Sequence, residues 1–225
     1  MNSILSSILI QHSPIFYPLI SLKLPNEIIA EINLSDTEPT LSSKIIADVP
    51  LFTEWIAQQL ASKGATYGIG GYCENRNIYA PYAAFCTHTA RTLHLGVDIW
   101  GAAGTPVYAP IGGMIHSYAY NDANGDYGVT IILQHNIDTT AFYTLYGHLS
   151  QGDLAAYRVG KFITRGEVIG HFGNPTENGN WPPHLHFQII EDIGQYEGDY
   201  PGVCALAEKE KFVSNSPDAT LMINF

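Results

Sequence analysis

The 225-residue sequence predicts a mostly β protein, built as an antiparallel two-layer β sandwich or partly open barrel with a few peripheral helices. Two observations lead to this fold class. From about Arg91 to Ile190, short runs rich in β-branched and aromatic residues alternate with turn signals such as "NDANGDYG". No helical pattern interrupts these runs, which favours antiparallel pairing between consecutive strands.

The segments on either side have a different character, so we divide the chain into three parts. Residues 1–90 are expected to be an N-terminal extension with one or two helices packed on the core, 91–192 the β core, and 193–225 a C-terminal extension. In the first part, "TEWIAQQLASKG" has apolar residues at helical spacing, with Thr53 as the expected N-cap and Gly64 as the stop. In the last part, "CALAEKEKF" predicts a short helix.

Composition and charge exclude several classes of partner. The formal charge of −11 argues against nucleic acid, because nothing would neutralise the phosphates, and disfavours adhesion to anionic membranes or wall polymers. No uninterrupted apolar run reaches the about 20 residues of a membrane span. The first residues, "MNSILSSILIQHSPIFYPLISLK", have no positive leader. A cytoplasmic location is the default expectation, with a periplasmic or extracellular one as the alternative.

The three cysteines, Cys73, Cys86 and Cys204, form no C-x-x-C pair, which disfavours a thiolate zinc site. Cys73 and Cys86 could close a short disulfide loop in an oxidising compartment. The odd number of cysteines favours reduced, buried thiols instead.

The stretch "WPPHLHFQII" places two histidines, His184 and His186, on one side of a predicted strand, because residues i and i+2 share a face. Leu185 and Phe187 then face the other way. Two basic rings side by side fill a core poorly and need partners when buried. Such a pair is better explained by a metal ion, provided that other segments supply further ligands.

The best further ligands are His94 and Asp98 in "RTLHLGVDIW". On a straight strand these two residues would lie about 13 Å apart, too far to reach one zinc ion. The chain must therefore bend between them, and Gly96 is the residue that permits a bend or bulge.

Together, these residues match a catalytic zinc site with an open coordination position. His94, Asp98 and one histidine of the pair form a neutral-nitrogen, carboxylate-oxygen, neutral-nitrogen set. The second histidine of the pair would remain near the open position. His148 in "TLYGHLS" is a further candidate, expected to share a strand face with Tyr146. The other histidines are interpreted as surface or hydrogen-bonded core residues: His12, His88, His116, His135 and His171.

Five stretches, in order, resemble the lysostaphin-type (LytM-type) zinc metalloendopeptidases, which cut peptide bonds in bacterial peptidoglycan. They are "HLGVDIWGAAGTPVYAPIGGMIHS", "YGVTIILQH", "TLYGHLS", "VGKFITRGEVIGHFGN" and "PPHLHFQI". The resemblance covers about Arg91 to Ile190. It implies that one zinc ion is bound by His94, Asp98 and His186, and that His148 and His184 are the catalytic histidines. It also implies a two-layered antiparallel β fold of the duplicated hybrid motif type, with the site in a groove on one sheet.

The sequence departs from the family pattern in three places. Gln188 stands where the family commonly has Glu, and we interpret this as a local change in packing or hydrogen bonding. The loop "NPTENGNWPP" is bulkier than the family's usual one, so substrate preference cannot be carried over. Upstream, "GIGGYCENRNIYAPYAAF" lies outside the common family core and resembles a subgroup without export signals. There, Glu74, Arg76 and Tyr79 are expected either to form a rim or occlude the groove, or to act as a structural clamp between extension and core.

The resulting hypothesis is a zinc metallopeptidase that hydrolyses peptide bonds in peptidoglycan stem peptides or cross-bridges. The zinc ion would act as a Lewis acid, with His184 or His148 as general base and the other donating a hydrogen bond to the oxyanion. Two alternatives remain open. One is a non-catalytic zinc-binding or regulatory module of the same fold, and the other is an intracellular peptidase acting on small peptides or wall fragments.

Overall fold

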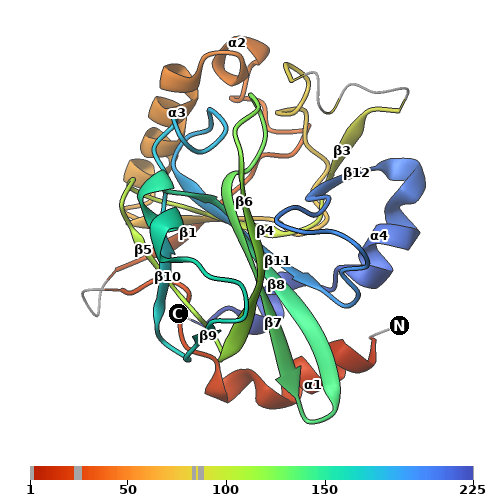
Figure 1. Ribbon diagram of the computed structural model, residues 1–225. Helices are drawn as coiled ribbons and strands as arrows, with labels where there is room; N and C mark the ends of the chain where they lie inside the picture. The colour runs from red at the N-terminus through yellow and green to blue at the C-terminus, as the bar shows by residue number, and fades with distance from the viewer. Residues whose placement is uncertain (1–2, 23–26, 83–84, 86–88, 225) are drawn as a thin grey trace.

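The computed structural model describes residues 3–22, 27–82, 85 and 89–224, and is organised around one eight-stranded sheet (Figure 1). In spatial order its strands are β1 (Ile29–Ile32), β2 (Tyr67–Gly70), β4 (Val97–Trp100), β11 (His184–Ile190), β8 (Thr140–Leu149), β7 (Gly128–Ile137), β6 (Gly113–Asn121) and β9 (Phe162–Ile163). All neighbouring pairs are antiparallel except β1 and β2, which are parallel. The predicted mostly β, antiparallel fold class is confirmed.

The sheet stays open, because within the described residues β1 and β9 form its two edges and do not pair with each other. A second, smaller layer covers one face. It contains the ribbon of β5 (Pro106–Tyr108) and β10 (Val168–His171), whose Val107 and Ile169 pack into one core with Val129, Ile131 and Leu133 of β7. This apolar face stabilises the sheet, and the opposite face has a smaller apolar cluster that contains Ile132, Leu145 and Ile190.

Helices lie at the periphery (Figure 1). They are α1 (Ile4–His12), α2 (Ser43–Ile46), α3 (Val49–Ser62) and α4 (Lys209–Asn215), with 3-10 turns η1 (Ser13–Ile15), η3 (Gln151–Ala156), η4 (Leu206–Glu208) and η5 (Ala219–Met222). Helix α1 contributes Leu5 and Leu9 to the main core. Helix α3 packs Phe52 and Trp55 into a second cluster that contains Trp100. None of the described helices has the length and apolar character needed to cross a membrane.

The predicted limits of two helices differ from the observed ones. Helix α3 begins at Val49, and its N-cap is Asp48, whose side chain accepts from the Leu51 amide, so the prediction of Thr53 as N-cap is wrong. Thr53 lies inside the helix and donates to the Val49 carbonyl. Gly64, with φ +62°, follows the helix end as expected.

The C-terminal part differs from the sequence prediction because a strand replaces the start of the predicted helix. Cys204 belongs to β12 (Val203–Ala205), which pairs antiparallel with β3 (Arg91–His94), and helix α4 follows. Cys73 and Cys204 are free thiols, in agreement with the preference for reduced cysteines, and Cys86 lies outside the described residues.

The predicted N-terminal extension adds strands as well as helices, since β1 and β2 continue the sheet beyond β4. We retain the boundaries at residues 90/91 and 192/193 as a proposal.

Candidate metal centre and active site

The register between β4 and β11 brings together the polar residues of the site. His186 lies directly opposite Asp98, and His184 directly opposite Trp100. On the other face Leu185 and Phe187 are fully buried in the main core. The predicted division of "HLHF" into a polar and an apolar face is therefore confirmed, and the strand pairing supplies the carboxylate opposite one imidazole.

The expected bend between His94 and Asp98 is present. Strand β3 ends at His94 and pairs with β12, while β4 begins at Val97 and enters the large sheet. His94 Nε2 consequently lies 3.2 Å from Asp98 Oδ1.

Gly96 has a further role that the sequence did not reveal. A Cβ atom at Gly96 would lie 2.6 Å from Cε1 and 2.7 Å from Nε2 of His186. Only glycine lets this ring approach the backbone so closely.

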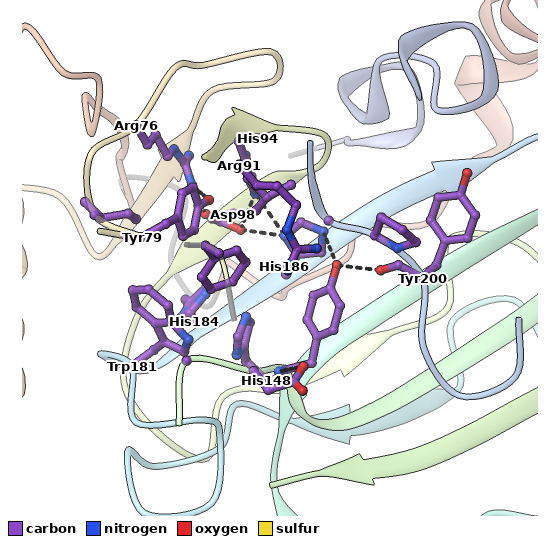
Figure 2. Close-up of a pocket in the computed structure, with 18 of the residues that line it drawn as sticks. Arg76, Tyr79, Arg91, His94, Asp98, His148, Trp181, His184, His186 and Tyr200 are labelled. Atoms are coloured by element: carbon purple, nitrogen blue, oxygen red, sulfur yellow. Dashed lines mark hydrogen bonds and ion pairs between the residues drawn. The ribbon is translucent and has the colours of Figure 1, made fainter. Parts of the chain in front are cut away.

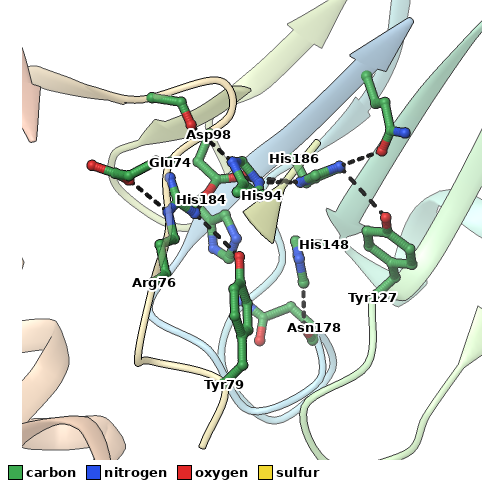
Figure 3. A network of polar contacts seen from close by, with 12 residues as sticks. Glu74, Arg76, Tyr79, His94, Asp98, Tyr127, His148, Asn178, His184 and His186 are labelled. Atoms are coloured by element: carbon green, nitrogen blue, oxygen red, sulfur yellow. Dashed lines mark hydrogen bonds and ion pairs between the residues drawn. The ribbon is translucent and has the colours of Figure 1, made fainter. Parts of the chain in front are cut away.

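The three predicted ligands form a compact buried triangle (Figure 3). His94 Nε2 lies 2.9 Å from His186 Nδ1, and Asp98 Oδ1 lies 3.2 Å from the first and 3.1 Å from the second. His94 is 1% exposed, and Asp98 and His186 are each 3% exposed. Donor atoms bound to one tetrahedral zinc ion are separated by about 3.3 Å, as follows from bonds of about 2.0–2.1 Å. The triangle matches that spacing to within a few tenths of an ångström.

Hydrogen bonds fix which ring nitrogens carry a proton. His94 Nδ1 contacts the Gly71 carbonyl oxygen at 3.1 Å, and a carbonyl can only accept, so Nδ1 is the donor and Nε2 has the lone pair. The Gln188 amide nitrogen donates to the Pro201 carbonyl and the Ser216 hydroxyl, which turns its Oε1 toward His186 Nε2 at 3.0 Å. His186 Nε2 must then be a donor, and in the neutral imidazole, the form that binds a metal, Nδ1 has the lone pair.

Three acceptor atoms without a proton therefore face one another in a buried place. Two are imidazole lone pairs and the third is a carboxylate oxygen. Such an arrangement is repulsive by itself and needs a cation between the atoms. The donor set, two neutral imidazoles and a carboxylate, is one that zinc accepts while leaving a position open.

The charge states agree with this geometry. Burial, and then the nearby Arg76 cation, lower the pKa of His94 to about 4, so its imidazole is neutral at pH 7. Burial by itself raises the pKa of Asp98, but the Arg76 cation at its second oxygen helps to hold this pKa well below its ordinary value. The site thus presents a neutral ring and an ionised carboxylate.

The two predicted catalytic histidines lie beside the triangle (Figure 2). The rings of His148 and His184 are 4.1 Å apart, and Trp100 stacks on the other side of His184 at 4.1 Å. His148 Nδ1 donates to the Asn178 carbonyl and His184 Nδ1 to the Pro182 carbonyl. In both rings Nε2 has no hydrogen-bond partner within the described part of the chain, so each ring keeps a free lone pair in the cavity.

The side chain of His148 reaches the site by an unusual backbone conformation. Its φ is +62°, in the left-handed region that non-glycine residues seldom adopt. Strand alternation places Tyr146 in the main core, against Phe187. The left-handed turn directs His148 to the opposite face, so the expectation that Tyr146 and His148 share a face is wrong. Such strained residues cluster at functional sites.

A cavity of about 170 Å³ adjoins these residues. Its walls include all five predicted site residues, together with Tyr79, Tyr127, Trp181 and Gly202. Sequence reasoning missed Tyr127, whose hydroxyl donates to the Tyr200 carbonyl at 3.1 Å and lies 3.5 Å from His186 Nε2. The turn "GDYG" preceding β7 carries no signal that singles out this tyrosine.

Beside the triangle lie three residues of the upstream segment, Glu74, Arg76 and Tyr79 (Figure 3). Arg76 is 1% exposed, donates to Glu74 and Asp98, and lies 3.4 Å from the Tyr79 hydroxyl. Arg76 and Tyr79 also line the cavity. The two expected roles, cavity wall and clamp, are therefore both compatible with this placement.

Comparison with known proteins gives the same family that the sequence motifs predicted. Residues 92–197 match the sequence model of peptidase family M23. An L-Ala–D-Glu endopeptidase of Bacillus subtilis is 30% identical over 115 residues, 49% of this chain and 33% of that protein. The peptidoglycan DD-endopeptidase ShyC of Vibrio cholerae is 28% identical over 97 residues, 43% of this chain and 20% of that protein. The chain thus spans a third or less of the length of either relative.

Two solved structures are also similar. A zinc-containing peptidase from Vibrio cholerae is 26% identical, with a TM-score of 0.36, and the match covers 44% of this chain and 27% of that one. The catalytic domain of lysostaphin from Staphylococcus simulans is 25% identical, with a TM-score of 0.37, over 55% of this chain and 81% of that one. Residues 92–197 are therefore similar to peptidase family M23, the family that the sequence motifs resemble.

Proposed function

We propose that the protein is a zinc-dependent metalloendopeptidase that hydrolyses peptide bonds in peptidoglycan stem peptides or cross-bridges. The observation that carries this proposal is the set of three proton-free acceptor atoms, His94 Nε2, His186 Nδ1 and Asp98 Oδ1, at 2.9–3.2 Å from one another. The names of the two relatives, both endopeptidases, support the choice of a peptide bond as substrate.

His94, Asp98 and His186 would hold the zinc ion. When bound, zinc supplies a Lewis acid and lowers the pKa of water at the open position. His148 and His184 each offer a free Nε2 in the cavity. We assign proton transfer from the attacking water to one of these rings, and a hydrogen bond to the developing oxyanion to the other. The carbonyls of Asn178 and Pro182 leave a lone pair on Nε2 of both rings, which is the state that accepts a proton from water. The ring that donates to the oxyanion must also have a proton on Nε2, and so must act as an imidazolium.

Two substitutions test the assignment. His186→Ala should abolish zinc binding, because it removes one of three ligands. His148→Ala should retain zinc but lose most turnover, because its ring is not part of the triangle. Zinc content is measured on the purified protein, and activity by digestion of whole peptidoglycan with mass analysis of the products. Unchanged turnover in His148→Ala would refute the role given to that ring.

A second candidate function is hydrolysis of short peptides or wall fragments rather than the intact polymer. The cavity of about 170 Å³ favours it, since pockets for larger ligands commonly measure about 300–1,000 Å³. Digestion of soluble muropeptides but not of intact peptidoglycan would favour this function. A protein that contains zinc yet cleaves neither substrate would instead be the non-catalytic module of the same fold. The predicted cytoplasmic location, which suits soluble fragments, remains a proposal.

A further inference from the structure

Each ligand of the proposed metal centre has a polar partner that orients it. Gln188 fixes His186, the Gly71 carbonyl fixes His94, and Arg76 binds the second oxygen of Asp98. Two of these partners lie upstream of residues 92–197, which the family model matches. The orientation of two ligands therefore depends on a segment outside the family core.

Arg76 makes the most specific of these contacts. Its Nη1 donates to Asp98 Oδ2 at 2.6 Å, and its Nε donates to Glu74 Oε2 at 2.6 Å. The other oxygen of Glu74 accepts from the Leu34 amide at 3.1 Å, which fixes that carboxylate in turn. With Oδ2 occupied, Asp98 can present only Oδ1 to His94 and His186 (Figure 3).

The backbone around Arg76 is fixed to the strand that carries His94. The Arg76 amide donates to the Thr92 carbonyl, and the His94 amide donates to the Glu74 carbonyl, both at 2.9 Å. The guanidinium also needs space beside the sheet. A Cβ atom at Gly70 would lie 2.9 Å from Arg76 Nη2, so the glycine at the end of β2 provides that space.

The chemistry of this contact requires arginine. A guanidinium has a planar fork that can bind two carboxylates in fixed directions, whereas a lysine ammonium is a point charge without such directionality. Arg76 is 1% exposed and lies between two acidic side chains that are themselves largely buried. A buried cation in this setting persists only because both carboxylates compensate it.

We infer that the segment Gly71–Arg76 is part of the metal centre, and that Arg76 is a positioning residue that holds Asp98 with a single oxygen toward His94 and His186. The choice of zinc rests on the proposed function, but the positioning itself does not depend on any peptidase activity. Partners of metal ligands commonly change metal affinity by about 10–100-fold when they are replaced.

The test compares Arg76→Lys with the unmutated full-length chain. We expect Arg76→Lys to raise the dissociation constant for zinc by about 10–100-fold, measured by competition with a chromophoric chelator. We also expect an altered visible spectrum of the cobalt-substituted protein, because Asp98 would be free to rotate and bind through both oxygens. A purely structural role would leave that spectrum unchanged. Arg158→Lys is the matched control, since Arg158 donates to the Ala155 and Tyr157 carbonyls and, among the described residues, has no other hydrogen bond.

A second measurement uses the unmutated protein, so that a folding defect in Arg76→Lys cannot leave the inference untested. Zinc titration followed by NMR should shift the side-chain Nε–H signal of Arg76 and leave that of Arg158 in place. Two results would overturn the inference: a folded Arg76→Lys protein with zinc affinity within twofold and an unchanged cobalt spectrum, or an Arg76 signal insensitive to zinc. A protein that binds zinc as expected but cleaves no peptide would refute the proposed function alone.

Discussion

Replacing Gly96 with alanine tests the metal centre directly, because the new methyl group would occupy space that the His186 ring needs. The added Cβ would lie 2.6 Å from His186 Cε1 and 2.7 Å from the Phe187 carbonyl oxygen. Carbon atoms make ordinary contacts at about 3.5 Å, so the ring must move by about 0.9 Å. Metal sites tolerate deviations of only about 0.2 Å in ligand distances. We therefore expect zinc affinity to fall at least tenfold, and the metal-free protein to lose about 1–3 kcal/mol of unfolding free energy.

The assay combines a zinc competition titration with urea unfolding of the metal-free protein. Gly152→Ala is the control, because a Cβ there has Ser150 Oγ at 3.7 Å as its nearest neighbour and meets no obstacle. We expect this control to bind zinc as the unmutated chain does. Zinc affinity of Gly96→Ala within twofold of the control would contradict the close approach of His186 to the backbone, and with it the geometry of the site.

Three further predictions concern other parts of the structure. Gln188→Glu keeps an acceptor for His186 Nε2 and should retain zinc affinity, whereas Gln188→Leu removes it and should raise the zinc dissociation constant about tenfold in the same titration. Removing zinc with a chelator, starting from zinc at about 100 times its dissociation constant, should lower the melting temperature by roughly 5–10 °C in a calorimetric scan; no change would mean that the triangle binds no metal. Burial lowers the pKa of His135 to about 4, far from the metal centre, where its ring contacts Gly112 and Thr144. In the unfolded chain the His135 imidazole takes up a proton near pH 6.5, whereas in the folded protein it does so only near pH 4. The free energy of unfolding therefore decreases as the pH falls below 6.5, and His135 should account for about 2 kcal/mol of the decrease between pH 7 and 5. Urea unfolding at both pH values should show a smaller loss for His135→Gln, and an equal loss would disprove the assignment.

Local patterns predicted the fold class, and His94 and Asp98 with one histidine of "HLH" as ligands, because these predictions depend on short-range geometry. The choice of His186 came from the family resemblance, since its contacts with His94 and Asp98 join residues 92 and 88 positions apart. Strand alternation in "HLHF" separates the imidazoles from Leu185 and Phe187 whatever the rest of the chain does. The spacing of His94 and Asp98 demanded a bend, and Gly96 was the residue between them that allows one.

Other features depend on contacts between segments far apart in the sequence, and no local pattern encodes them. The contact of Arg76 with Asp98 joins residues 22 positions apart, and that of Tyr127 with the Tyr200 carbonyl joins residues 73 apart. His148 was found by its motif, but its left-handed backbone was not, because alternation predicts the opposite face. The tautomers of the ligand histidines likewise become visible only once Gly71 and Gln188 are placed beside them.

The pairing of β12 with β3 has a consequence for how the protein matures during synthesis. Val203 lies opposite His94, and the Gly202 carbonyl accepts from the Leu95 amide, so a ligand-bearing strand obtains its neighbour from residues made long after it. While a growing chain is still shorter than this point, His94 keeps its contacts with Gly71 and Glu74 but lacks the support of β12. We therefore expect a ribosome-bound chain stalled before Gly202 to bind zinc more weakly than the full-length chain.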